Sequence, residues 1–306
     1  IIISIIDILT IIVLFIIYGP IPNFRDWFIT TALKTGHHQY FANVIYSDKI
    51  IIETLKNNVI TEFDSDTDAS DINFDNDSKN QYDSIYEQQI LERDKDALYK
   101  LIEINEKNYS GYLVAIYDSS NIDLVTSKYI KSGGQTLDAL SKDYDALVAI
   151  NASGFVVNDK VLSPAGTTIQ DGKIVSIGSS NVHGGGLIGF NKDGVLVLTT
   201  KSAEDAIKDG IVDAMSFGPF LIVNGKSAEV SGNGGWGYAN RTAIAQRKDG
   251  IVLFLVIDGR GANGSAGISI KDMISLFEKY GAYNAANLDG GGSSTLTINH
   301  EIINDP

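Results

Sequence analysis

A run of glycines and hydroxyl side chains near the carboxyl end of the chain has the composition of a ligand site. It reads Asn287-Leu-Asp-Gly-Gly-Gly-Ser-Ser-Thr295. Consecutive glycines leave no side chains in the way, so peptide N–H groups can approach a ligand closely. Asp289 adds a carboxylate, and Ser293 and Ser294 add hydroxyl donors. The stretch predicts either an anion site beside a carboxylate or a tight turn in which Asp289 bonds its own backbone.

Two other polar residues follow strand-like runs. The apolar segment 146–150 ends at Asn151, and the most apolar segment of the chain, 251–257, ends at Asp258. Side chains at a strand terminus are held by the sheet and open to solvent, which suits a ligand site. Asp258 has a second interpretation, because Asp before Gly also opens ordinary turns.

Glycines 259, 261 and 264 match the dinucleotide pattern G-x-G-x-x-G. In a nucleotide-binding unit, however, the helix begins within the glycines. Here the helix signal comes later, with Ser269 and Asp272 as a capping box and Gly281 as the stop. The glycines therefore favour a mobile loop that covers a pocket. No cofactor is predicted.

The elements that position these residues are short strands. Segments 111–117, 173–177, 186–190, 195–199, 220–223 and 242–246 have strand character, and only 137–145 and 269–280 within this part of the chain are clearly helical. Hairpin turns are indicated by Asp171-Gly172, Asp193-Gly194, Asn224-Gly225 and Asp249-Gly250. The pattern predicts an α+β fold with a mixed, largely antiparallel sheet and few helices.

The composition excludes several function classes. A net charge of −14 makes nucleic acid an improbable partner and requires any phosphate site to be a local basic spot. The chain has no cysteine, which excludes thiolate metal sites, a cysteine nucleophile and disulfides. No His and carboxylate cluster has metal-ligand spacing, so no metal is predicted.

The first part of the chain has a different character. Residues 1–20 are almost entirely apolar and predict an uncleaved, single-pass transmembrane anchor. Residues 21–61 predict a helical juxtamembrane stem with interfacial aromatic residues. The acidic segment 62–85 predicts a disordered linker, and residues 86–306 predict the globular domain. We also expect sequence to be missing at both termini.

The motifs together resemble the phosphodiester glycosidase family. The resemblance covers residues 86–306 and rests on Asn151-x-x-x-Phe155, Gly218-Pro-Phe-Leu, Arg241-Thr-Ala-Ile-Ala, Asp258-Gly-Arg, Tyr280-Gly-Ala and the stretch 287–295, in that order. Two features depart from the family pattern. Ala152 and Ser153 replace the usual glycines, and the chain stops at Pro306, where the family continues into a final strand.

The resemblance implies hydrolysis of a sugar-1-phosphodiester at its glycosidic C1–O bond, as in N-acetylglucosamine-1-phosphodiesters. The phosphate leaves as an anion, so stabilising its charge and the oxocarbenium-like sugar is the main task. The implied catalytic residues are Asp289 and Asp258, as nucleophile or base in an order left open, with Arg241 holding phosphate. The implied substrate-binding residues are Asn151, Thr242, Asn287, Gly290, Gly291, Gly292, Ser293 and Ser294.

Two functions from different classes fit these features. The first is an extracytoplasmic glycosidase, held at the cell membrane by its anchor, that acts on phosphate-linked glycans of the cell envelope or an exopolysaccharide. The second is a non-catalytic glycan-binding protein of an envelope-assembly complex. Two carboxylates beside an anionic ligand favour the enzyme, because a binding protein has no need of them.

Overall fold

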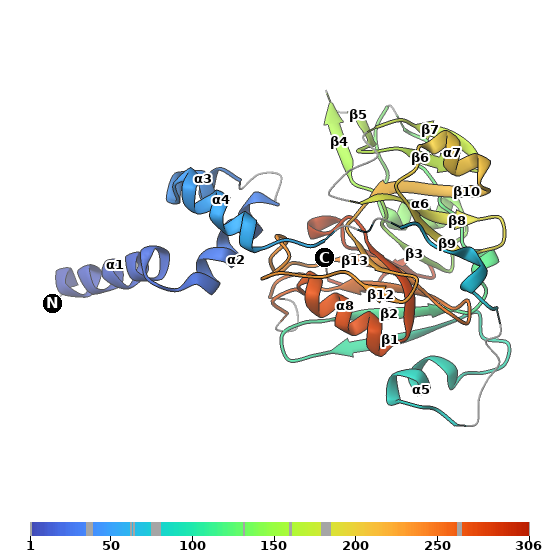
Figure 1. The fold of residues 1–306 in the computed structure, drawn as a ribbon, viewed down its shortest axis with the longest axis horizontal. Helices are drawn as coiled ribbons and strands as arrows, with labels where there is room; N and C mark the ends of the chain where they lie inside the picture. The colour runs from blue at the N-terminus through green and yellow to red at the C-terminus, as the bar shows by residue number, and fades with distance from the viewer. Residues whose placement is uncertain are drawn as a thin grey trace. The chain divides into compact units, whose positions relative to one another are not determined.

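The structure is a computed structural model of the 306-residue chain, and it describes residues 2–34, 39–61, 63, 65–74, 81–130, 132–158, 161–178, 185–261 and 265–305. The chain forms two compact units. The first contains residues 1–61, 229–238 and 269–271, and the second contains 62–228, 239–268 and 272–306. Figure 1 labels their helices and strands.

The second unit contains a seven-stranded sheet with the order β1-β2-β14-β13-β15-β11-β12. Every neighbouring pair in this sheet is antiparallel. Its strands are β1 (Tyr99–Asn105), β2 (Ser110–Ile116), β11 (Phe220–Val223), β12 (Lys226–Ser227), β13 (Thr242–Arg247), β14 (Val252–Ile257) and β15 (Ala282–Asn287).

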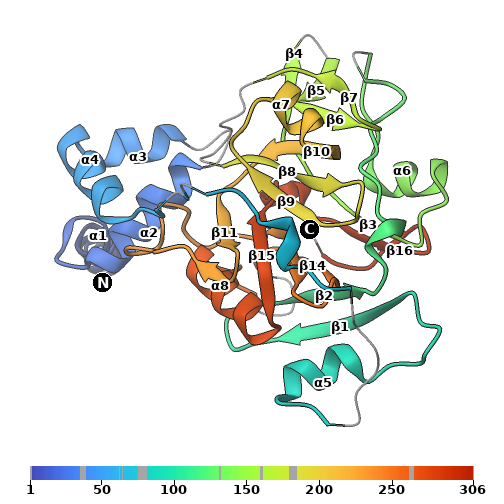
Figure 2. The ribbon, with the colours of Figure 1, turned by 45° about the vertical axis from the view of Figure 1, so that its right-hand side comes forward.

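A five-stranded sheet forms a second layer with the order β7-β6-β10-β8-β9 (Figure 2). Its strands are β6 (Thr168–Gln170), β7 (Lys173–Ser176), β8 (Gly186–Asn191), β9 (Leu196–Thr199) and β10 (Ile211–Phe217). Smaller sheets are formed by β3 (Val148–Ile150), β16 (Leu296–Ile298) and β17 (Glu301–Ile302), and by the hairpin of β4 (Phe155–Asn158) and β5 (Val161–Pro164). The helices are α5 (Ile85–Leu91), α6 (Leu137–Asp143), α7 (Ala203–Lys208) and α8 (Ile270–Lys279), the last of which begins in the first unit.

The core of the second unit lies between its two large sheets. Phe190, Leu198 and Met215 of the five-stranded sheet belong to the same buried cluster as Phe254 and Ile244 of the seven-stranded sheet. Alternate residues of a strand face opposite sides, so each sheet contributes one apolar face to this layer. The predicted α+β class with mainly antiparallel sheets is confirmed.

The predicted hairpin turns form where Gly follows Asp or Asn. Asp171-Gly172 joins β6 to β7 with φ values of 51° and 67°, and Asn224-Gly225 joins β11 to β12 with 52° and 74°. Positive φ at both central residues gives the turn whose twist matches two antiparallel strands. Local sequence therefore specified these strand pairs directly.

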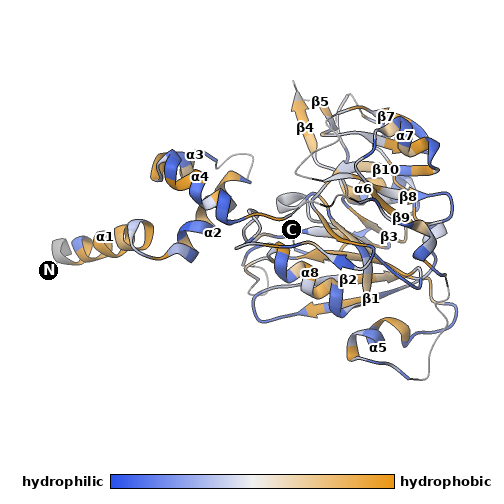
Figure 3. Ribbon diagram, in the orientation of Figure 1, coloured by the Kyte–Doolittle hydropathy of each residue, from blue (hydrophilic) through white to orange (hydrophobic). Residues whose placement is uncertain are grey.

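The first unit is a cluster of helices: α1 (Ile2–Tyr18), α2 (Pro22–Leu33), α3 (Gln39–Ile45) and α4 (Asp48–Asn57). Ile29, Ala42, Tyr46 and Ile51 form its small core. Figure 3 shows α1 coloured largely as hydrophobic. From Ile5 onward, its large apolar side chains are exposed, apart from Ile17.

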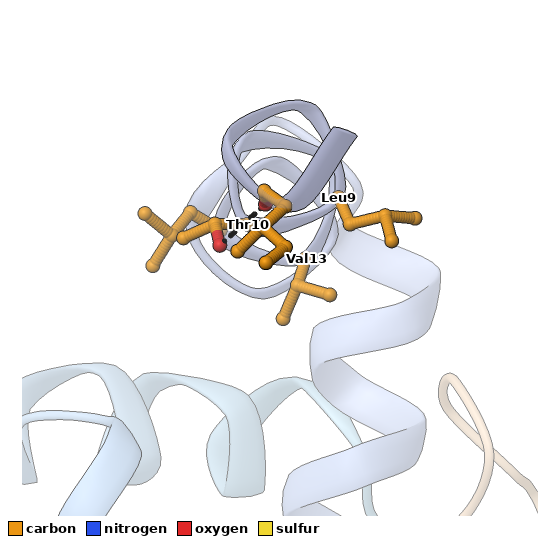
Figure 4. Close-up of a pocket in the computed structure, with 5 residues that line it drawn as sticks. Leu9, Thr10 and Val13 are labelled. Atoms are coloured by element: carbon orange, nitrogen blue, oxygen red, sulfur yellow. Dashed lines mark hydrogen bonds between the residues drawn. The ribbon is translucent and has the colours of Figure 1, made fainter. Parts of the chain in front are cut away.

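The predicted transmembrane anchor is not found as one helix. Within the described ranges, no single helix has both the length and the apolar character for a membrane span, whereas the helices 5–18 and 22–33 meet these requirements only as a pair bent by 77°. Figure 4 shows a shallow depression on α1 between outward-pointing side chains that include Leu9, Thr10 and Val13. All of its lining comes from one helix, and its one hydroxyl, on Thr10, bonds Ile6 O at 2.9 Å.

The segment predicted as a disordered linker makes specific contacts within the second unit over residues 65–74. Thr67 exchanges two hydrogen bonds with Leu198, and Asn73 N donates to Lys248 O at 2.9 Å. Tyr283 donates its hydroxyl to Asp71 Oδ2 at 2.6 Å. Disorder is therefore wrong for these residues, because backbone and side-chain bonds fix them to the sheets. Residues 75–80 lie outside the described part of the chain.

Candidate active site

The predicted polar residues meet at one edge of the seven-stranded sheet. The pairs Thr242↔Val256 and Ala243↔Asn287 bring the start of β13 together with the ends of β14 and β15. Arg241, Asp258 and the loop 288–295 immediately adjoin these strand ends. The antiparallel ladder therefore places residues from three distant parts of the sequence at the same edge.

Asn151 ties three segments together at this edge. Its Nδ2 donates to Asp289 O at 2.7 Å, and its Oδ1 accepts from Thr242 Oγ1 at 2.6 Å and from Thr295 N at 3.0 Å. A carbonyl oxygen has two lone pairs, and both are used here. Asn151 and Thr242, expected to bind substrate, therefore hold the loop 288–295 in place.

The glycine run forms a hydrogen-bonded turn that has neighbouring residues on one side only. Gly291 N donates to Asn240 O at 3.0 Å, Asn240 Nδ2 donates to Gly291 O, and Gly290 N donates to the Asp289 carboxylate. These two glycine amides thus have protein acceptors, as the turn interpretation required, and they do not form an open anion cradle. Apart from the neighbouring residues in the chain, no described residue has an atom within 4 Å of where a Cβ would stand on Gly291 or Gly292, so this side of the turn is open.

Gly290 lets the turn approach the start of β13. A Cβ on this residue would lie 3.0 Å from Asn240 O, 3.6 Å from Arg241 Cα and 3.9 Å from Arg241 Cγ. The first of these distances is shorter than an ordinary carbon–oxygen contact. The absence of a side chain at Gly290 therefore allows the Arg241 side chain to pack against the turn.

Asp289 is the carboxylate with the properties of a reacting group. Burial raises its pKa, while hydrogen bonds from the Ser293 hydroxyl and the Gly290 amide lower it less. Its Oδ1 lies 3.9 Å from where a Cβ of Gly154 would stand, and the same position is 3.3 Å from Phe217 Cε2, so the carboxylate lies close to this glycine. A raised pKa makes a carboxylate a stronger base, which suits a role in proton transfer.

Arg241 is a buried cation with another cation nearby. It is only 4% exposed, and its Nε donates to Ile268 O at 3.2 Å. Burial chiefly, and the positive charge of Arg260 in addition, lower the pKa of Arg241 to about 10. The two guanidinium groups form the local basic spot that an acidic chain requires for binding phosphate.

Arg260 was missed as a candidate residue, although it lies in the Asp258-Gly-Arg motif. Its side chain is exposed, unlike that of Arg241. An exposed guanidinium can contact a phosphate directly, whereas a buried one acts mainly through its charge. The motif was the available signal, but only the structure places this arginine beside Arg241.

Asp258 has the environment of a structural carboxylate. It is 2% exposed, and its oxygens accept hydrogen bonds from Ser110 Oγ at 2.9 Å and Asp305 N at 3.1 Å. It follows β14, whereas Asp289 follows β15, and β13 lies between them. Two strand spacings separate the two backbones by about 10 Å. The contacts of Asp258 favour a scaffold role over a nucleophilic one.

Asn287 and Ser294 are fully buried. Asn287 Nδ2 donates to Gly218 O at 2.9 Å, while Asn287 Oδ1 and Ser294 Oγ have no hydrogen-bond partner among the described residues. Asn304 binds the same loop, because its Nδ2 donates to Ser294 O at 2.8 Å. Ser293, which bonds Asp289, is therefore the hydroxyl of the pair that belongs to the site.

The described ranges contain no group of three or more His, Cys, Asp or Glu residues that could hold a metal ion. All the sequence-predicted site residues lie in the second unit.

Comparison with known proteins identifies the family of the chain. The family model for phosphodiester glycosidases matches residues 144–306, which is more than half of the chain and includes every predicted site residue. A Bacillus subtilis protein, the SPbeta prophage-derived uncharacterized protein YomE, is 32% identical over 200 residues, covering 62% of this chain and 30% of that protein. The bovine N-acetylglucosamine-1-phosphodiester alpha-N-acetylglucosaminidase is 29% identical over 156 residues, covering 44% of this chain and 29% of the enzyme.

The fold has the same relatives. The zebrafish N-acetylglucosamine-1-phosphodiester alpha-N-acetylglucosaminidase catalytic domain, auto-inhibited by its pro-peptide, superposes with a TM-score of 0.54 at 21% identity and covers 72% of this chain and 80% of that one. The curated relatives are longer, and this chain matches only about a third of their length. The match over residues 144–306 and the shared fold establish that the chain belongs to the phosphodiester glycosidase family.

Proposed function

We propose that this protein hydrolyses the glycosidic C1–O bond of a sugar-1-phosphodiester of the N-acetylglucosamine-1-phosphodiester type. Membership of the family supports hydrolysis of phosphodiester-linked sugars. The single observation that carries the proposal for this chain is Asp289, a carboxylate of raised pKa at the sheet edge that also holds Arg241.

The phosphate is held by the arginine pair. Arg260 contacts its oxygens from the surface, and Arg241 contributes positive charge from behind Gly290. As the C1–O bond breaks, negative charge grows on the departing phosphodiester oxygen, which fixed positive groups stabilise. A phosphate leaving group needs little protonation, so this charge stabilisation carries more of the reaction than in the cleavage of ordinary glycosides.

Asp289 acts on the sugar side of the bond. It either attacks C1 as a nucleophile or removes a proton from the attacking water, and both roles need its ionised form. Ser293 and the Gly290 amide hold the carboxylate through hydrogen bonds. Because both oxygens of Asp258 accept hydrogen bonds from the protein, we assign it no role in this step. Asp289 is then the reacting carboxylate in our proposal.

The membrane anchor and the cell-envelope setting also belong to the proposal. We infer that the exposed apolar residues of α1 contact lipid and that the globular domain acts outside the cytoplasm on phosphate-linked glycans. Apart from Ser4, Asp7 and Thr10, every residue of α1 is apolar, and its exposed large side chains support this contact with lipid. Residues 65–74 join residues 86–305 in the proposed catalytic domain, since their hydrogen bonds lie within the second unit.

The test is release of free N-acetylglucosamine from a small N-acetylglucosamine-1-phosphodiester by the full chain. Replacing Asp289 with Asn should reduce kcat by about 10²–10⁴-fold, because it removes a nucleophile or base. Asp209→Asn, which changes an exposed carboxylate bonded to Lys201, is the matched control and should leave kcat unchanged. Binding of several sugar-1-phosphodiesters without turnover by the parent would instead favour a glycan-binding protein.

A further inference from the structure

The first unit, here called the helical unit, includes two segments that are distant from its N-terminal helices in the sequence. Residues 229–238, which connect β12 to β13, and residues 269–271, at the start of α8, belong to this unit. The chain between them, 239–268, belongs to the second unit. Arg241 stands three residues after the first segment.

Backbone pairing holds the first of these segments. Thr61 N donates to Glu229 O at 2.9 Å, and Ser231 N donates to Val59 O at 2.9 Å, on either side of an antiparallel bridge between Ile60 and Val230. The segment thus adds a short strand pair to residues that follow α4 directly.

A buried polar network continues this attachment. Asn58, which is 4% exposed, accepts from Asn233 N at 2.9 Å and donates to Asp26 Oδ2 at 3.0 Å. Asn233 Nδ2 donates in turn to Thr30 Oγ1 at 2.9 Å. Buried hydrogen bonds of this kind define a single arrangement, because breaking one leaves an unsatisfied polar group.

The segment needs this support because of its composition. It contains Gly232, Gly234, Gly235 and Gly237, all with positive φ. Glycine loses more conformational freedom on ordering than any other residue. Lys34 adds a cation–π contact, with its Nζ 4.1 Å from the centre of the Trp236 ring.

The contacts that hold Arg241 lie next to both enclosed segments. Ala239, which follows Tyr238, pairs with Ile268, which precedes Ser269, through hydrogen bonds of 3.3 and 2.8 Å. Arg241 Nε bonds the same Ile268 carbonyl at 3.2 Å. Ala239 and Ile268 are therefore each next in the chain to a segment that belongs to the helical unit.

We propose that the N-terminal helical unit is a positioning element for Arg241, in addition to any role as an anchor. The network of Asn58, Asn233, Asp26 and Thr30 orders residues 229–238 and thereby sets the pairing of Ala239 with Ile268. That pairing orients Arg241 against Gly290 at the candidate active site. This inference rests on the proposed function of Arg241 in binding the phosphodiester.

A double-mutant cycle in the full chain tests the inference, with turnover of the small N-acetylglucosamine-1-phosphodiester as the readout. Asn233→Ala should lower kcat/KM by about tenfold in the parent, because small displacements of a positioned group are costly. In an Arg241→Lys background the same change should cost less than about twofold. Tyr46→Phe, which removes a hydrogen bond to Ile17 O within the same unit, should have little effect in either background.

Hydrogen exchange provides a second readout that needs no activity. Asn233→Ala should accelerate exchange of the Ile268 amide, which bonds Ala239 O, and of the Ile257 amide, which bonds Arg241 O. The Leu198 amide, which bonds Thr67 Oγ1, should be unchanged. If Asn233→Ala does not fold, Thr30→Val removes only one bond of Asn233 and replaces it in both assays.

The outcomes separate the two proposals. A parent chain that binds but does not turn over the substrate contradicts the proposed function, and hydrogen exchange then decides the inference. A parent that is active, with the same loss from Asn233→Ala in both backgrounds, overturns the positioning role. Unchanged exchange at Ile268 and Ile257 overturns it as well.

Discussion

Asp258 and Asp289 look alike in the sequence, because each directly precedes glycine in a motif of the family. Their surroundings differ in the structure. Asp258 is buried, with its two oxygens bonded to Ser110 and Asp305, whereas the side chain of Asp289 is only half-buried. The chemistry of a carboxylate depends on such neighbours, and these come from distant parts of the chain.

The raised pKa of Asp289 predicts a pH-dependent stability. Because burial raises the pKa, the folded protein binds a proton at Asp289 more tightly than the unfolded chain. The stabilisation of the fold that comes from this proton binding is fully present below the ordinary aspartate pKa. It is lost as pH rises through the raised pKa of the folded state. Asp289→Asn removes this titration, so we expect it to melt at a higher temperature than the parent at neutral pH.

Thermal melts of the parent and Asp289→Asn from pH 3 to pH 8 provide the measurement. The difference in melting temperature should grow in favour of the variant as pH rises. A variant that melts lower than the parent at neutral pH would show that the ionised carboxylate stabilises the fold, contrary to this prediction.

The exposed guanidinium of Arg260 predicts a binding defect. Arg260→Gln should raise KM for the phosphodiester by about tenfold, since a hydrogen bond to a charged group contributes about 1.5–3 kcal/mol. The melting temperature should change little, because the side chain is exposed. Initial-rate kinetics check this, with Lys192→Gln as a surface control. An unchanged KM would remove Arg260 from the site.

At the scale of elements, two glycines of the turn after β15 differ in the space around them. The place of a Cβ on Gly290 is 3.0 Å from Asn240 O, whereas that on Gly292 has no atom within 4 Å. Gly290→Ala should therefore lower the free energy of unfolding by about 1–3 kcal/mol and reduce kcat/KM, because it moves the turn away from Arg241.

Gly292→Ala is the matched control and should change the free energy of unfolding by less than about 0.5 kcal/mol. Urea denaturation and kcat/KM of both variants test the pair. Equal effects of the two substitutions would mean that contact with Asn240 and Arg241 does not define the turn.

At the scale of the whole molecule, α1 exposes a nearly continuous series of large apolar side chains from Ile5 to Tyr18. We expect the full chain to co-sediment with phosphatidylcholine vesicles, because most side chains of α1 are large, apolar and exposed. A chain that begins at Phe15 should remain in the supernatant and keep kcat/KM within about twofold, since the network around Asn58 does not involve residues 1–14. A full chain that stays in the supernatant would contradict the proposed lipid contact.

The sequence alone predicted the family, several hairpin turns and the segments that form β2, β8, β13 and β14, but it did not predict β1, β10 or β15. Dipeptides such as Asp171-Gly172 act over a few residues, and they predicted the turns that the structure contains. The motif 287–295 likewise predicted a site with Asp289 as its carboxylate, because a glycine run beside an acid is a local feature.

Only the tertiary structure decided which partners each predicted site residue contacts. Asn151 bonds Asp289 and Thr242, Asp258 bonds Ser110, and Asn233 bonds Asn58, all across long separations in the sequence. These contacts depend on which strands become neighbours, and the order β2-β14-β13-β15-β11 is not the order of the chain. Arg241 is more buried than Arg260, and Asp258 is more buried than Asp289, because of the same arrangement of strands. Local sequence patterns do not specify such packing between distant segments.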